Sequence, residues 1–162
     1  MRLTIAILLL ASALPAQYPI SANALHWSGT TSSAGPFCWG FTCNPETAAV
    51  VPGESGTFTV RGAWNQPFAL AIAPTASRCL ALPGIFNALV LDDPIYVTHT
   101  GVLNQLSPIL ACPSGMVVIP IVLPPWLPPG LSFSVQGLVG VPGDPALPPT
   151  FSFTQAITFT VI

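Results

Sequence analysis

The sequence contains very little charge. Only 5% of its 162 residues are charged, whereas about a quarter is usual for soluble domains. Its three basic side chains, Arg2, Arg61 and Arg78, cannot form the positive surface that nucleic acid or an anionic membrane surface requires. Hydrophobic residues make up 51% of the chain, which excludes a disordered protein. We therefore expect a folded domain that binds no nucleic acid.

Helical periodicity and long apolar runs are also missing from the main part of the chain. Twenty prolines and thirteen glycines interrupt it at short intervals. The most apolar stretch, residues 116–131, contains five prolines and cannot form a membrane-spanning helix. The sequence therefore predicts no insertion into a membrane once the N-terminal segment has been removed.

The N-terminus has the pattern of a signal peptide. Arg2 precedes an apolar run over residues 3–10, which is shorter than the roughly 20 residues of a spanning helix. Small residues ending at Ala13 or at Ala24 give two candidate cleavage sites. We expect residues 1–24 to be the signal peptide and residues 25–162 to form one domain in the periplasm or on the cell surface.

Export determines how the cysteines are interpreted. The four cysteines are Cys38, Cys43, Cys79 and Cys112. An even number in an oxidising compartment indicates disulfides, and four cysteines allow three pairings. Sequence proximity favours Cys38–Cys43 with Cys79–Cys112. The alternatives are a redox site, which prefers C-x-x-C, and a zinc site with His26 or His99, which usually uses two close cysteine pairs. We expect disulfides and no metal.

Period-2 alternation predicts short β-strands along the domain. The stretches are 56–64, 67–74, 88–91, 95–100, 115–124, 131–139 and 151–161. Residues 115–124 are apolar on both faces, as in a central strand, but Pro120 indicates an edge, a bulge or two short strands. In 151–161 only Gln155 departs from the alternation. With strands between 25 and 50, we expect an all-β, two-sheet antiparallel sandwich of seven to nine short strands, immunoglobulin-like or jelly-roll-like.

Several segments resemble a recurrent module of bacterial exported proteins. The matching residues run from Gly53 or Gly56 to Gly62, from Pro125 to Gln136, over Pro142-Gly143, and from Ser152 to Val161. The resemblance implies a C-terminal β-sandwich of secreted or surface proteins with no established activity. The segment CWGFTC, residues 38–43, lies outside this pattern.

Catalytic patterns are weak in this sequence. No G-x-S-x-G elbow occurs, and His99 near Asp92 and Asp93 is better explained as a strand residue beside a turn. The few carboxylates are typical of turns, and a calcium site normally needs more of them. We expect no enzymatic activity and no cofactor.

Two tryptophans are candidates for ligand stacking. Trp39 lies within CWGFTC and Trp126 lies between prolines, so both are expected to be exposed. Flat aromatic faces stack on sugar rings, although tryptophan more often fills a core. A surface with so few charges favours assembly instead. The sequence thus predicts a secreted structural or adhesive envelope module that binds itself or other envelope proteins. The alternative is a carbohydrate-binding module with a polysaccharide ligand.

Overall fold

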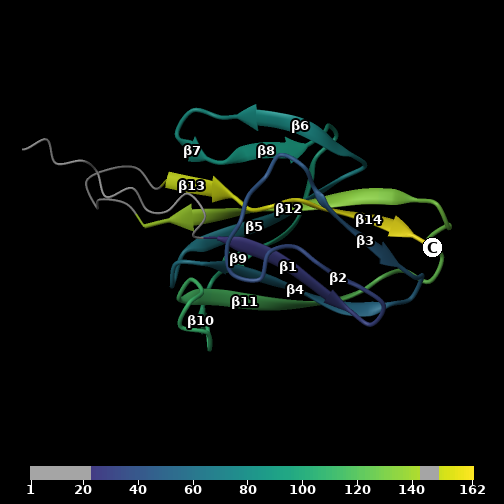
Figure 1. The fold of residues 1–162 in the computed structure, drawn as a ribbon, viewed down its shortest axis with the longest axis horizontal. Coiled ribbons are helices and arrows are strands. Elements are labelled where there is room, and N and C mark those ends of the chain that lie inside the picture. Colours follow the sequence, from purple (N-terminus) through teal and green to yellow (C-terminus); the bar gives the residue numbers. More distant parts are fainter. Residues whose placement is uncertain (1–22, 143–149) are drawn as a thin grey trace, which may run out of the picture.

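The computed structural model describes residues 23–142 and 150–162, and all of its regular elements there are β-strands (Figure 1). The first sheet has five antiparallel strands in the order β10-β11-β4-β1-β2. Their bounds are Gln105–Leu106, Gly115–Val122, Ser55–Gly62, Ala24–Gly29 and Ser33–Ala34. The expected all-β class is confirmed.

The second sheet is built around β12 (Ser132–Val141), its longest strand. On one side β12 pairs with β5 (Pro67–Ala73), which pairs with β9 (Tyr96–Val102). On the other side lie β13 (Thr150–Phe153) and β14 (Ile157–Val161). β7 (Ile85–Phe86) pairs with β13, and β3 (Glu46–Val50) pairs with β14. A separate pair, β6 (Ala76–Ala81) and β8 (Ala88–Leu91), lies at the top of Figure 1, with the first sheet at the bottom.

The core lies between the two main sheets, and the alternating residues face it as expected. Phe58 and Val60 of β4 are buried, as are Phe68 and Leu70 of β5. At the C-terminus Ile157, Phe159 and Val161 are each at most 1% exposed. Alternation therefore placed the inward side chains correctly because each strand covers the core with one face only.

Three details differ from the sequence-based expectation. The described residues form fourteen strands instead of seven to nine, three of them with two residues each. The second sheet is mixed, because β3 and β7 run parallel to their neighbours. β11 is not central: it pairs with β4 along its length but with β10 only at two positions, so Pro120 lies on a mostly free edge.

The expected closing strand 151–161 is divided in two at Gln155. The Gln155 side chain is buried and turns away from the ladder. Its Oε1 accepts from the Thr42 amide at 2.5 Å, and its Nε2 donates to the Asn44 carbonyl at 2.5 Å. The break therefore anchors the cysteine-containing loop to the second sheet.

Both disulfides form, but the pairing favoured from sequence is wrong. Cys38 is bonded to Cys112, and Cys43 is bonded to Cys79. The reason is the path of residues 35–45, which cross from β2 in the first sheet to β3 in the second. Each cysteine of this crossing meets a segment from a different hairpin, so proximity in sequence did not decide the pairing.

The expected signal peptide lies almost entirely outside the described residues. Asn23 and Ala24 are described: Ala24 begins β1 and is fully buried, and the Asn23 Nδ2 donates to the Ser152 carbonyl at 3.0 Å. Over residues 23–142 and 150–162, no helix has the length and apolar character needed to span a membrane.

Candidate functional site

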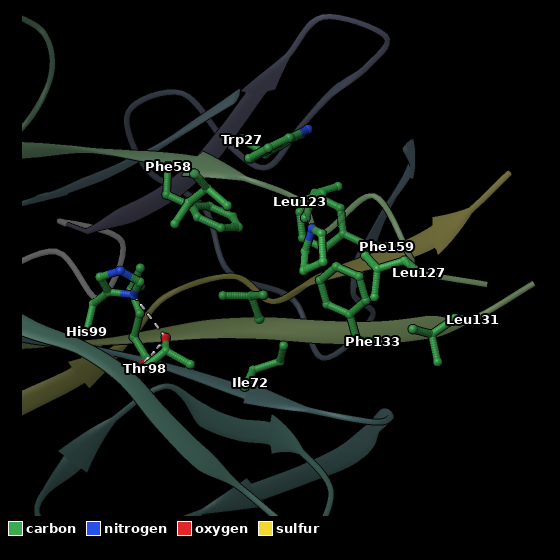
Figure 2. A pocket seen from close by; sticks show the side chains of 14 residues that line it. Trp27, Phe58, Ile72, Thr98, His99, Leu123, Leu127, Leu131, Phe133 and Phe159 are labelled. Atoms are coloured by element: carbon green, nitrogen blue, oxygen red, sulfur yellow. Dashed lines mark hydrogen bonds between the residues drawn. The ribbon is translucent and has the colours of Figure 1, made fainter. Parts of the chain in front are cut away.

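An apolar pocket of about 330 Å³ lies between the two sheets (Figure 2). Its side chains come from both sheets and from the connection between β11 and β12. The lining residues are Trp27, Phe58, Leu70, Ile72, Thr98, His99, Ile121, Leu123, Pro124, Leu127, Leu131, Phe133, Val135 and Phe159. None of these described lining residues is Asp, Glu, Lys or Arg. Pockets of a few hundred Å³ are typical of small-molecule sites.

The pocket reaches the fully buried core. Trp27, Leu70 and Phe159, which form its inner wall, are each 1% exposed. The Phe159 ring is stacked on Phe133 at 5.1 Å between centroids and meets the edge of Trp27 at 5.4 Å. The wall is therefore made of aromatic rings that hold one another in place.

Glycine in the first sheet makes room for the Trp27 ring. A Cβ atom on Gly56 would lie 2.2 Å from Trp27 Cη2 and 2.5 Å from Cζ2. The ring can lie flat against β4 only because no side chain is present at this position. Gly56 thus keeps Trp27 out of the pocket volume.

Two residues with polar side chains border the pocket at a bulge in β9, although almost all of the lining surface is apolar. Leu70 is opposite His99 and Ala71 is opposite Val97, so Thr98 is an extra residue in β9. His99 is the only residue of β9 that is not exposed, and its partner Leu70 faces the core. The bulge therefore directs Thr98 and His99 together to the same pocket.

Thr98 and His99 are joined by a hydrogen bond whose direction depends on the histidine tautomer. Thr98 Oγ1 donates to the Leu70 carbonyl at 3.3 Å and lies 3.2 Å from His99 Nδ1. In the neutral tautomer with a proton on Nδ1, that atom donates to Oγ1, and Nε2 is a hydrogen-bond acceptor.

Two edge strands border the pocket. Among the described strands, β9 pairs with β5 alone, and β11 is unpaired on its outer side from Val117 to Val122. β9 contributes Thr98 and His99 to the lining, and β11 contributes Ile121. The sandwich is therefore open between these two strands, where both sheets end.

The structure places Trp39 and Trp126 on the surface but far apart. They are 52% and 76% exposed, respectively. Trp39 follows Cys38, whose disulfide partner Cys112 comes just before β11, whereas Trp126 follows the end of β11. The eight residues of β11 span roughly 25 Å, so the two rings do not form a shared platform.

A buried arginine lies on the outer face of the first sheet. Arg61 is 4% exposed, its guanidinium lies 4.8 Å above the Phe37 ring, and Nη1 donates to Ser107 Oγ at 2.9 Å. Burial lowers the pKa of Arg61. The Cys38–Cys112 disulfide holds Phe37 over this side chain, so the cluster fastens the crossing loop to the sheet.

Asp92 and Asp93 have a structural role at the β6–β8 hairpin. Asp92 and Asp93 pair with Arg78, at 3.2 and 2.6 Å, in the β6–β8 hairpin. Hydrogen bonds from Thr75 and Ser77 lower the pKa of Asp92. No three His, Cys, Asp or Glu side chains among the described residues are grouped to hold a metal ion.

No sequence pattern predicts the pocket directly. The sequence presents His99 as a strand residue beside a turn, with a catalytic base and a metal ligand as alternatives, and the apolar residues after β11 as a hydrophobic run broken by prolines. One signal is present: the apolar connection 123–131 contains four prolines, which hinder its pairing in a ladder, and its Leu123 and Leu127 pack against the core.

Comparison with known proteins assigns the chain to no family. No protein-family model matches the chain, and no curated protein matches it.

Proposed function

We propose that this protein is a secreted, non-enzymatic structural or adhesive module of the bacterial cell envelope or surface. The observation that supports it is the free edge of β9, which contains no charged residue. Tyr96, Val97 and Val102 on this strand are 60%, 63% and 42% exposed. An uncharged edge with exposed apolar side chains is a template for pairing with another chain.

The second free edge is less suited to pairing. β11 carries Pro120, which lacks an N–H and interrupts a continuous ladder. We therefore assign the pairing to β9, with another copy of the chain as its partner. The two disulfides agree with export, because such bonds persist in oxidising compartments. Residence in the periplasm or on the cell surface is part of the proposal.

The test is the oligomeric state of the oxidised, exported protein. Light scattering after size exclusion should show self-association that increases with concentration. Val97→Lys places a charge on the edge and should yield a monomer, because burying that charge in a strand pair is unfavourable. Leu110→Lys, at a fully exposed loop position outside both edges, is the matched control and should associate like the wild type. A wild-type protein that is monomeric at every concentration contradicts the proposal.

Sugar binding by Trp39 or Trp126 is the second candidate, favoured by the exposure of both rings. Because the rings lie apart, each would stack on a sugar singly. Tryptophan fluorescence should then change with a polysaccharide, and either Trp39→Ala or Trp126→Ala should remove that change. A broad glycan array without a signal would exclude this candidate.

A further inference from the structure

We propose that the pocket between the sheets binds a free medium-chain fatty acid, with its carboxyl group at Thr98 and His99. The inference does not depend on assembly through β9, because every lining residue belongs to one chain and no partner strand is needed to form the pocket.

The size of the pocket sets the length of the chain. Its volume is about 330 Å³. Water occupies about 30 Å³ per molecule in the liquid, and a methylene group takes up roughly as much room. The pocket therefore holds an aliphatic chain of roughly ten carbons. A lipid with two long acyl chains would not fit into it.

The shape of the lining places the two ends of the ligand. Figure 2 shows His99 and Thr98 at one end of the cavity, and Leu127 and Leu131 at the other. The rings of Phe58, Phe133 and Phe159 lie between these ends. An amphiphile with one polar end matches this arrangement, because polar side chains are present at one end of the lining only.

The chemistry of His99 selects the head group. In the tautomer whose Nδ1–H donates to Thr98, the neutral ring has Nε2 free to accept a hydrogen bond from a protonated carboxyl group. When the ring is protonated, Nε2–H donates to a carboxylate in a charge-assisted bond. No acidic residue is part of the described lining, so nothing at the pocket repels the anion.

Apolar burial supplies the remaining selectivity. An apolar cavity of this kind is poorly hydrated, and a chain that enters it loses its own contact with water. Each methylene buried should increase the affinity roughly fourfold. The affinity should therefore rise from hexanoic to decanoic acid, and should fall again at tetradecanoic acid, whose chain exceeds the pocket.

Isothermal titration calorimetry of the exported, oxidised protein tests the proposal with decanoic acid as the probe. We expect saturable binding of one molecule per chain. Methyl decanoate, which has no acidic proton or charge, should bind at least about tenfold more weakly. His99→Ala should lower the affinity for decanoic acid by a similar factor. Thr100→Ala, at the exposed neighbouring position, should leave that affinity unchanged.

A second pair of variants tests the location. Val135→Phe fills the pocket and should abolish binding, whereas Val118→Phe makes the same change at a partly exposed position outside the lining. Ile72→Phe, nearer the surface of the pocket, replaces Val135→Phe if that variant does not fold. Phospholipid vesicles distinguish the free acid from a membrane-bound acyl chain, and we expect no binding to them.

Three results would overturn the proposal. These are the absence of saturable binding of decanoic acid, unchanged binding in a folded pocket-filling variant, and binding to vesicles in preference to the free acid. None of them bears on the oligomeric state, so failure here and failure of the assembly proposal are distinguishable.

Discussion

The buried side chain of Gln136 offers the sharpest test of how this fold is held together. Gln136 lies on β12 and is 2% exposed. Its Oε1 accepts from the Val90 amide at 3.0 Å, and its Nε2 donates to the Ala88 and Thr154 carbonyls at 3.0 Å each. One side chain thus joins β12, the β6–β8 hairpin and the break between β13 and β14.

Replacing Gln136 with Met removes these three bonds while nearly keeping the volume. A buried backbone group left without a partner costs about 1–3 kcal/mol, and a carbonyl tolerates this better than an N–H. We therefore expect Gln136→Met to lower the free energy of unfolding by about 3–4 kcal/mol. Gln136→Ala should cost more, because it also creates a cavity.

Chemical denaturation with the disulfides intact, followed by tryptophan fluorescence and far-UV circular dichroism, measures this loss. Gln105→Met is the matched control, because Gln105 is exposed on β10, and it should stay within about 0.5 kcal/mol of the wild type. Hydrogen exchange at the Val90 amide should accelerate in Gln136→Met. If Gln136→Met were as stable as the control, the network would not be the link between hairpin and sheet.

Three further outcomes are expected. Burial would raise the pKa of the Glu54 carboxyl, but hydrogen bonds from Thr31 and Val51 outweigh it and lower the pKa. The stabilisation that the ionised Glu54 gains from these hydrogen bonds is therefore fully present at a pH above the ordinary pKa of glutamate. It is lost as the pH falls through the pKa of Glu54 in the folded state. Glu54→Gln should therefore have a lower free energy of unfolding than the wild type at neutral pH, and this free energy should fall less as the pH is lowered. Acid-unfolding curves that run parallel for the two proteins would contradict this. Gly56→Ala should drive the Trp27 ring into the pocket and cost about 1–3 kcal/mol, so an unchanged melting temperature would refute that contact. N-terminal sequencing should find cleavage upstream of Asn23, because Ala24 is fully buried in β1, and a mature start at Leu25 would contradict this.

Alternation predicted the strands whose two faces have different surroundings. β4, β5 and β14 each turn one apolar row to the core, so their period-2 pattern was visible in the sequence. β6, with the sequence ASRCLA, lies in a two-stranded sheet with little burial, and no alternation marked it. Gln155 did depart from the pattern, and it marks the point where the closing strand breaks.

The pocket and the disulfide pairing could not be predicted, because both depend on how distant segments meet. Cys38 and Cys43 are close in sequence, but the crossing between the sheets takes them to different hairpins. His99 was placed in a strand correctly, yet only the bulge at Thr98 determines which side chains turn toward the pocket. A cavity results from incomplete filling between two sheets, which composition does not reveal.

The nested disulfides also determine how the domain would respond to mechanical load. Cys38 and Cys112 are 74 residues apart in the chain, and the Cys43–Cys79 bond lies within that span. A pulling force applied outside this segment cannot extend it while the outer bond is intact. The contour length withheld is roughly 250 Å, at about 3.3–3.6 Å per residue. Under tension the chain would therefore lengthen only through β1 and β2 at one end and β11 to β14 at the other. Reduction of the outer bond would release the segment except for the loop of 36 residues that the Cys43–Cys79 bond still closes.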